Sequence, residues 1–479
     1  MVSNKTVARI LLVFLVLGFV VRLYRLNNPI ADWHAWRQAD TSAVSRNFVT
    51  EGFDLLHPKF DDLSNVPSGL DNPNGYRFVE FPIYNVAQAG LFKLFGILTL
   101  EEWGRLVSIL ASLAGSYFLF KLTSKYSGRI AGLGAAFFYL FLPFDIYYSR
   151  TILPDTSMVA TLLAAIYFFD LWLDDKKKRW LPLLLATIFL AVSVLLKPYG
   201  LFYGLVFLAM IYQRFGWGFI KQLKLYLFAL CALAPFVAWR MWISKYPEGI
   251  PASAWLFNGN GIRFRPAFFR WMGYERLTKL ISGYTLVILQ ALGLYQLRFE
   301  KATIVYGAFV LSAVAYVCVI ATGNVQHDYY QIVIMPVVAM IFGLGTKFLL
   351  EMKPLQKLHL GKILLVLLTV TGLYLSWLQV RDYFNINNWS IVIAGQVVDQ
   401  VTPKDAKVIA LYDGDTSFLY QTKRKGWASF EKPLPQMIKM GADYLVLANP
   451  TKVDEGLGKD YKIIKETKEY MLINLHQKP

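Results

Sequence analysis

Three acidic residues stand in polar segments between long apolar runs, where a carboxylate could take part in chemistry. They are Asp40 in HAWRQADTS, Glu80 in RFVEFPIY and Asp155 in RTILPDTS. A positioned carboxylate can accept the proton of a reacting group and so act as a general base. These residues are therefore the candidate catalytic groups.

Asp40 lies in segment 31–52, whose pattern predicts an amphipathic helix. At about 100° per residue, apolar side chains such as Trp36 fall on one arc, and Asp40 falls within that arc. The carboxylate should then face the membrane domain rather than water, which makes it a better proton acceptor. The alternative is a structural ion pair with Arg37 or Arg46.

Asp155 and Glu80 each come at the start of a predicted helix. Asp155 follows Pro154, so it could cap the helix N-terminus, and Arg150 could also be its partner. Glu80 precedes the apolar stretch 81–96, where it could fix the start of the helix or bind a ligand.

Three basic residues are candidates for binding a phosphate. Lys197, in VSVLLKPYG, either snorkels from a helix end or presents its ammonium group to a phosphate at the membrane surface. Arg263 and Arg265, in NGIRFRPAFFR, could bind the same phosphate in a bidentate way, and their alternative role is contact with lipid headgroups.

Aromatic and polar residues complete the candidate pocket for an acceptor. Trp36 and Arg37 flank Asp40, and His327, Tyr329 and Tyr330 lie in the late polar segment NVQHDYYQ. A lone histidine is weak evidence for a metal, so the sequence leaves open whether a divalent metal ion takes part.

The elements that must position these residues are membrane helices. The chain has 479 residues, of which 56% are hydrophobic and 17% charged, and its mean hydropathy is +0.41. This composition is typical of a polytopic membrane protein. Eleven apolar runs are long enough to span a bilayer. The predicted spans are about 8–26, 103–122, 129–149, 156–173, 180–196, 198–213, 223–243, 279–297, 302–321, 331–350 and 361–381.

The stretch 81–96 decides the topology. It is apolar but short for a span, and it carries Asn85, Gln88 and Lys93, so we place it at the membrane interface. Basic residues then concentrate in the connections on one side, as the positive-inside rule requires. The N-terminus is predicted to be cytoplasmic, and all the candidate residues reach the opposite face. The net charge of +17 is explained by these connections, so no nucleic-acid partner is expected.

The last hundred residues differ in character from the rest. Charged clusters alternate with β-rich runs at 407–412, 442–447, 461–464 and 470–475, and Pro433 and Pro435 are expected to open a helix. The sequence therefore predicts an all-α membrane domain over 1–383, with a first outer loop at 27–102, followed by a small extracytoplasmic α/β domain over 384–479.

With these motifs in view, residues 1–380 resemble the GT-C superfamily of polyprenyl-phosphate-dependent glycosyltransferases, in its protein O-mannosyltransferase and lipid A aminoarabinose transferase branch. The resemblance is carried by HAWRQADT after the first span, by EFPIYNVAQAGLFKLFG, and by RTILPDTSMV. LLKPYG and HDYYQIVIMP match more loosely. The family often has Asp-Glu at its first site, whereas this chain has Asp40 followed by Thr41.

The resemblance implies a GT-C fold, with outer juxtamembrane helices, in the plasma or inner membrane. It also implies inverting transfer of a sugar from a polyprenyl-phosphate donor to a glycan, lipid or protein acceptor. In that reaction Asp40 would be the catalytic acidic residue and Lys197 the donor-phosphate lysine.

Two other classes of membrane protein compete with this interpretation. A transporter or lipid flippase would need ionisable residues or broken helices near the bilayer midplane, whereas the charges here cluster at span ends and in loops. A polysaccharide polymerase or ligase of another fold would also use basic residues in outer loops, but the carboxylate of the first loop favours the GT-C interpretation.

The topology predicts that residues 121–129 are cytoplasmic and that the chain after Tyr383 is outside. A cysteine introduced at Lys125 should be protected from an impermeant thiol reagent in intact cells, and one introduced after Tyr383 should react. Labelling of the cysteine at position 125 from outside would show that 81–96 spans the membrane.

Overall fold

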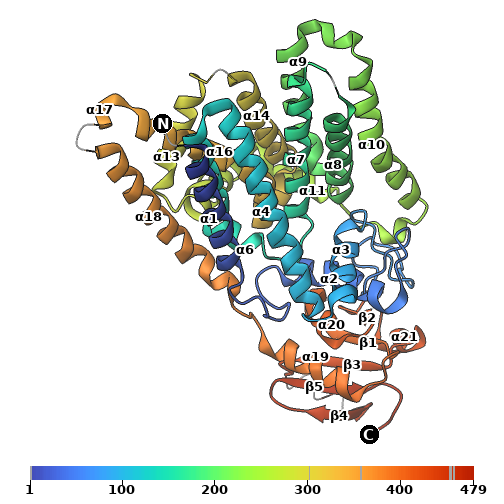
Figure 1. Cartoon of the computed structure of the whole chain (residues 1–479). Coiled ribbons are helices and arrows are strands. Elements are labelled where there is room, and N and C mark those ends of the chain that lie inside the picture. Colours follow the sequence, from blue (N-terminus) through green and yellow to red (C-terminus); the bar gives the residue numbers. More distant parts are fainter. Residues whose placement is uncertain (1–2, 178, 301, 357–358, 452–455, 457–458) are drawn as a thin grey trace. The chain divides into compact units, whose positions relative to one another are not determined.

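The computed structural model describes residues 3–177, 179–300, 302–356, 359–451, 456 and 459–479. The chain forms two compact units (Figure 1). The first comprises Met1–Tyr24, Leu106–Trp239 and Ser253–Asp382, and the second comprises Arg25–Arg105, Arg240–Ala252 and Tyr383–Pro479. The sequence-based division places the first loop with the membrane domain, whereas here the loop packs with the C-terminal segment.

The described part of the first unit is helical. Its elements, of which α4 and α10 extend across the unit boundary, are α1 (Asn4–Arg22), α4 (Leu100–Ser127), α5 (Arg129–Phe141), α6 (Pro143–Tyr148), α7 (Asp155–Asp174), α8 (Trp180–Leu196), η1 (Pro198–Tyr203), α9 (Gly204–Phe215), η2 (Gly216–Lys221), α10 (Leu223–Ile243), α11 (Trp255–Asn258), η4 (Gly259–Phe264), α12 (Pro266–Phe269), η5 (Arg270–Ile281), α13 (Leu286–Leu297), α14 (Thr303–Val319), α15 (Ala321–Gln326), η6 (Asp328–Ile334), α16 (Met335–Glu351), α17 (Lys353–Gln356) and α18 (Leu360–Val380).

Helix α16 is the centre of this packing, and glycines allow its close contacts. A Cβ atom on Gly343 would lie 2.3 Å from the carbonyl oxygen of Ala131 in α5. A Cβ atom on Gly345 would lie 2.2 Å from the carbonyl oxygen of Leu289 in α13. Small residues at such contacts are typical of helices that associate within a bilayer, where close packing replaces the hydrophobic effect.

All eleven predicted spans coincide with helical segments, but several are broken. Segment 129–149 divides into α5 and α6, and 279–297 includes the junction of η5 with α13, where the helix axis bends by 113°. By length and hydropathy, six helices in the described chain qualify as spans, or seven if the bent pair is counted as one. Three more apolar helices are shorter. The number eleven therefore stays a prediction.

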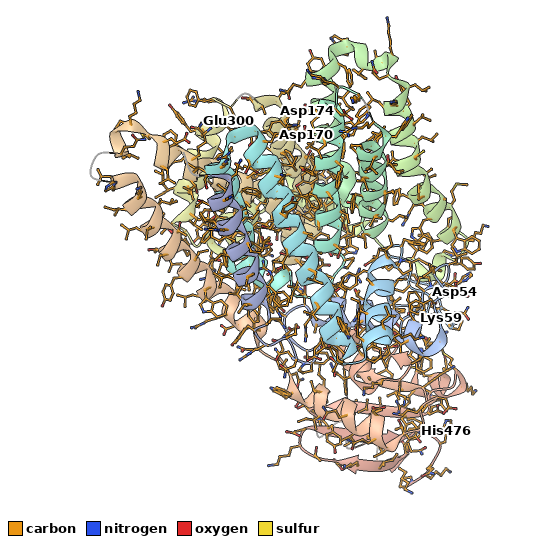
Figure 2. The ribbon with its side chains drawn as sticks, in the orientation of Figure 1. Asp54, Lys59, Asp170, Asp174, Glu300 and His476 are labelled. Atoms are coloured by element: carbon orange, nitrogen blue, oxygen red, sulfur yellow. The ribbon has the colours of Figure 1, made fainter. Side chains whose placement is uncertain are left out.

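Two ion pairs of Lys125 support the predicted arrangement of helix ends. Lys125 Nζ in α4 lies 2.5 Å from Asp170 Oδ2 and 2.6 Å from Asp174 Oδ2, and both carboxylates lie near the end of α7 (Figure 2). The C-terminal ends of α4 and α7 are thus held together, as the predicted topology requires of these two connections.

The second unit is an α/β structure. Its elements are α2 (Ala35–Glu51), α3 (Ile83–Phe95), η3 (Pro247–Gly249), η8 (Arg381–Phe384, starting in the first unit), α19 (Trp389–Val401), β1 (Val408–Leu411), α20 (Thr416–Thr422), β2 (Gly426–Trp427), α21 (Leu434–Lys439), β3 (Tyr444–Ala448), β4 (Lys462–Glu466) and β5 (Tyr470–Asn474). The four predicted strands are confirmed, and so is the helix that opens after Pro433. The two-residue strand β2 is too short for its pattern to be recognised.

The sheet has the order β2-β1-β3-β5-β4, with β1 parallel to β2 and β3, and β5 antiparallel to β3 and β4. Both faces of its inner strands are apolar. Val408 and Ala410 pack in one core with α19 and α20, while Ile409 packs in another with α21. Because successive side chains of a strand point to opposite faces, this apolar run is buried on both sides.

The first loop completes the edge of the sheet. Leu63 N donates to Gly426 O at 2.7 Å, and Gly426 N donates to Asp61 O at 3.0 Å. A Cβ atom on Gly426 would lie 1.8 Å from Val408 O, so only glycine fits at this point. Covering an edge strand removes a site for unwanted pairing and fixes the loop to the C-terminal domain.

Asp62, within this edge segment, provides a pH-dependent test of the packing. Burial raises the pKa of Asp62 to about 6, although hydrogen bonds from Ser64 oppose the shift and the charge of Asp40 adds to it. In the unfolded chain the pKa is about 3.9, so folding favours the protonated form. The stabilisation is complete below pH 4 and is lost as pH rises through 6.

Relative to Asp62→Asn, the wild-type protein should therefore lose up to about 3 kcal/mol of stability between pH 4 and pH 7. Thermal unfolding of both proteins in detergent across this range would measure the difference. A difference that is constant with pH would contradict the burial of an ionisable Asp62.

Candidate active site

Helix α2 carries Arg37, Asp40 and Thr41, and it is buried around most of its circumference. This differs from the predicted amphipathic helix with one wet face. Asp40 is 4% exposed, so the expected burial is correct, but neighbours on several sides produce it rather than one apolar arc. Polar residues of α2 can be buried because polar groups of adjacent segments form hydrogen bonds or ion pairs with them.

Asp40 is held by two contacts. Arg77 Nη2 donates to Asp40 Oδ2 at 2.5 Å, and the Thr416 hydroxyl donates to Asp40 Oδ1 at 2.7 Å. Asp40 does form an ion pair, as in the structural alternative, but its partner is Arg77 rather than Arg37 or Arg46. Arg46 pairs with Asp61 instead.

Glu80 forms a second ion pair beside the first. Arg37 Nη2 donates to Glu80 Oε1 at 2.6 Å, while Glu80 Oε2 is buried without a hydrogen-bond partner among the described residues. Both pairs line one narrow cleft with a volume of about 20 Å³. Its walls are formed by Arg37, Asp40, Thr41, Val44, Pro58, Arg77, Val79, Glu80, Pro82 and Asn85.

The two pairs together contain two cations and two anions. Their mutual attraction offsets the cost of burying four charges. Burial lowers the pKa of Arg77, and the charge of Asp40 opposes that shift. Within the described part of the chain, no group of three or more His, Cys, Asp or Glu side chains could hold a metal ion.

In the first unit, Asp155 and Lys197 form a buried ion pair. Lys197 Nζ lies 2.8 Å from both carboxylate oxygens of Asp155, and the side chains are 7% and 0% exposed. Asp155 begins α7 without capping it through its side chain, so the N-cap interpretation is wrong. Lys197 is not directed to solvent, so the snorkelling interpretation is also wrong.

Aromatic rings surround the lysine. Lys197 Nζ lies 5.6 Å from the ring centroid of Tyr199, 5.7 Å from that of Tyr329 and 5.9 Å from that of Tyr330. These rings stabilise a cation through their faces. His327 stacks on Tyr329 with centroids 5.7 Å apart, so three of the predicted pocket residues share one cluster with the lysine.

The two predicted arginines have different environments. Arg263 is bound to the end of α14: Nε donates to Cys318 O, and Nη2 donates to Val319 O at 3.1 Å. A cation at a helix C-terminus is a stabilising arrangement, which gives Arg263 a structural role. Arg265 is exposed at the start of α12, and its phosphate contact stays a prediction.

The sequence did not reveal several residues of the site. Arg77 is three positions before Glu80, but no pattern pairs it with Asp40. Thr416 comes from the C-terminal domain, 376 positions from Asp40. In the first unit, the Tyr148 hydroxyl donates to the buried Asp328, next to the tyrosine cluster.

The structure therefore brings the predicted residues into two groups. Arg37, Asp40 and Glu80 lie together in the second unit. Asp155, Lys197, Tyr329 and Tyr330 lie together in the first unit, with His327 beside them.

Comparisons with known proteins agree with this architecture. Residues 79–242 match the family model for dolichyl-phosphate-mannose-protein mannosyltransferases. No curated protein matches the chain by sequence.

Solved structures match over nearly the whole chain. ArnT from Cupriavidus metallidurans bound to undecaprenyl phosphate has 12% identity and a TM-score of 0.65, with 96% of this chain and 97% of that chain covered. AglB from Archaeoglobus fulgidus, in complex with an inhibitory peptide and a dolichol-phosphate, has 11% identity and a TM-score of 0.58, with 97% and 74% covered. Mycobacterial arabinofuranosyltransferase AftD has 12% identity and a TM-score of 0.59, with 99% and 42% covered.

The chain thus has the GT-C glycosyltransferase fold, and the resemblance seen in the sequence is confirmed.

The buried ion pair in the first unit gives a stability test. Lys197→Met should destabilise the protein by about 3–5 kcal/mol, because it leaves Asp155 charged and buried without a partner. The double variant Lys197→Met with Asp155→Asn should recover most of this loss. Thermal unfolding in detergent would compare the three proteins, and a single variant as stable as wild type would contradict the pairing.

Proposed function

We propose that this chain is an integral-membrane glycosyltransferase that moves a sugar, with inversion, from a polyprenyl phosphate to a hydroxyl group of an acceptor. The observation that carries the proposal is the buried Asp40, held by Arg77 and Thr416 in the wall of a cleft. The fold supports it, since the ArnT match is a complex with undecaprenyl phosphate and the AglB match one with a dolichol-phosphate. No observation favours the transporter alternative.

The donor sugar is already activated, because its anomeric carbon is bonded to a phosphate oxygen. In the proposed reaction Asp40 takes the proton of the acceptor hydroxyl, whose oxygen forms a bond to the anomeric carbon. The bond from that carbon to the phosphate oxygen breaks, and its electron pair leaves with the polyprenyl phosphate. Attack opposite the leaving group inverts the configuration.

Arg77 and Thr416 orient the base in this scheme. Each contacts a different oxygen of Asp40, which fixes the plane of the carboxylate while each oxygen retains a lone pair for the incoming proton. Glu80 Oε2 has no partner in the same cleft, so it is the alternative base or a hydrogen-bond acceptor for the sugar.

Lys197 is proposed to stabilise the leaving phosphate. Asp155 fixes its position, and an ammonium group that contacts one carboxylate still has an N–H donor for a phosphate oxygen. Arg265 could add a second contact. The acceptor, whether glycan, lipid or protein, would bind beside Asp40 on the outer face of the plasma or inner membrane, with the N-terminus in the cytoplasm.

Asp40→Asn should lower transfer by about 10² to 10⁴, because the amide keeps the size of the side chain but cannot act as a base. Glu80→Gln should lower it less if Glu80 only binds the sugar. The assay would follow release of undecaprenyl phosphate by mass spectrometry, using purified protein, synthetic undecaprenyl-phosphate sugars and cell-envelope lipid and glycan extracts as acceptors.

Glu51→Gln is the control, since it alters exposed ion pairs with Lys59 and Lys425 outside the cleft. Near-normal transfer by a folded Asp40→Asn variant would reject Asp40 as the base. If Glu80→Gln were the inactive variant, the base would be Glu80.

A further inference from the structure

A second cleft lies in the same unit, at the start of α2. It has a volume of about 140 Å³ and is open to solvent. Residues that bear polar or aromatic groups in its walls are Asp32, Trp33, His34, Trp36, Asn387, Tyr412, Asp415 and Ser417. Half of them come from the first loop and half from the C-terminal domain, so neither segment forms the cleft alone.

Ser417 is the clearest sign that the cleft has a ligand. Ser417 is 1% exposed, and its hydroxyl lies beside the Asp415 carboxyl group but makes no hydrogen bond of normal length and angle among the described residues. A buried hydroxyl without a partner is unfavourable, and native proteins rarely retain one without a reason. A hydroxyl group of a ligand in the cleft would satisfy it.

Two carboxyl groups provide further hydrogen-bonding capacity. Asp32 is buried and accepts from Gln38 Nε2 at 2.7 Å, which fixes its position. Asp415 accepts from Ser417 N at 2.7 Å as the cap of α20. Burial raises the pKa of Asp415, while the hydrogen bonds from Ser417 oppose the shift. The two carboxyl groups outnumber the single imidazole of His34 in the walls, which disfavours a phosphate.

The aromatic rings complete a surface suited to a sugar. Trp33 is 38% exposed and stacks on Tyr383, with ring centroids 4.9 Å apart. Trp36 and Tyr412 line the cleft as well. Aromatic rings offer a rigid apolar face at low entropic cost, while carboxylates accept hydroxyl hydrogens. Apolar C–H faces and hydroxyl edges together are the chemistry of a neutral sugar ring.

Thr416 links this cleft to Asp40. It lies between Asp415 and Ser417 in sequence, and its hydroxyl oxygen is 2.7 Å from Asp40 Oδ1 and 3.2 Å from the carbonyl oxygen of Trp36. In the walls of the cleft, Ser417 is thus adjacent to Thr416 in sequence, and Trp36 is four positions before Asp40 along α2.

We infer that this cleft binds a neutral sugar unit of the acceptor, and that the C-terminal domain therefore takes part in acceptor recognition. The inference rests on the proposed function, which supplies the acceptor. The specific contacts are the Ser417 hydroxyl and the ring of Tyr412.

Saturation-transfer difference NMR would test the cleft without a donor and without turnover. The probes are methyl α-glucopyranoside, methyl α-mannopyranoside and methyl β-galactopyranoside, with full-length protein in a detergent that has no sugar headgroup. Wild type should transfer saturation to the ring protons of at least one probe. Ser417→Ala should weaken this binding roughly fivefold, as expected for the loss of one hydrogen bond. Tyr412→Ala should weaken it as well.

Ser429→Ala is the matched control, because that hydroxyl also has no hydrogen-bond partner among the described residues and does not line the cleft. It should bind the probes like wild type. Ser417→Ala removes an unsatisfied group, so its thermal stability should equal or exceed that of wild type, and loss of binding would not reflect unfolding.

Equal saturation in all variants, or none in wild type, would overturn the inference. Binding can also be separated from transfer. If Asp40→Asn binds the sugar normally and no acceptor supports transfer by wild type, the proposed function fails while the cleft stands.

Discussion

The contact of Asp40 with Arg77 is the interaction on which the second unit depends. Two buried guanidinium groups alternate with two buried carboxylates, so removing any one leaves a charge that the others cannot offset. Hydrogen bonds hold the backbone around Arg77 in place: Arg77 N donates to Pro58 O, and Phe78 N donates to Gly249 O. A Cβ atom on Gly249 would lie 2.3 Å from the ring of Phe78, so that strand-like segment is tightly enclosed.

In the first unit, the Asp155–Lys197 pair is also a set of buried charges that balance each other, but it contains only one charge of each sign. Lys197 lies at the end of α8, and Asp155 at the first position of α7, where the helix dipole favours a carboxylate. Three tyrosine rings replace water around the ammonium group. The ammonium group is therefore balanced by Asp155 without any further anion.

Local sequence patterns predicted those structural features that depend on residues close together in the chain. Apolar runs and β-rich runs located the helices and strands, and the position of Asp155 beside Pro154 marked the start of α7. The partners could not be predicted, because they are distant in sequence: Lys197 is 42 positions from Asp155 and Arg77 is 37 from Asp40. Asp40 is buried, as expected, but the cause is the polar groups around α2 rather than an apolar arc on the helix. The periodicity of one helix cannot show which groups from other segments surround that helix.

Those polar groups explain why α2 has a defined position. Asn85 Nδ2 donates to Thr41 O at 2.6 Å, and Ser45 Oγ donates to Gln88 Oε1 at 2.7 Å, so the polar side chains of α3 that made it unsuitable as a span are used against α2. Such hydrogen bonds specify register more strictly than apolar contacts, because a shift leaves buried groups unpaired. Since Thr416 of the C-terminal domain bonds to the other side of α2, a carboxylate on this helix is fixed from both directions. The C-terminal domain is thus part of the structure that positions the proposed base.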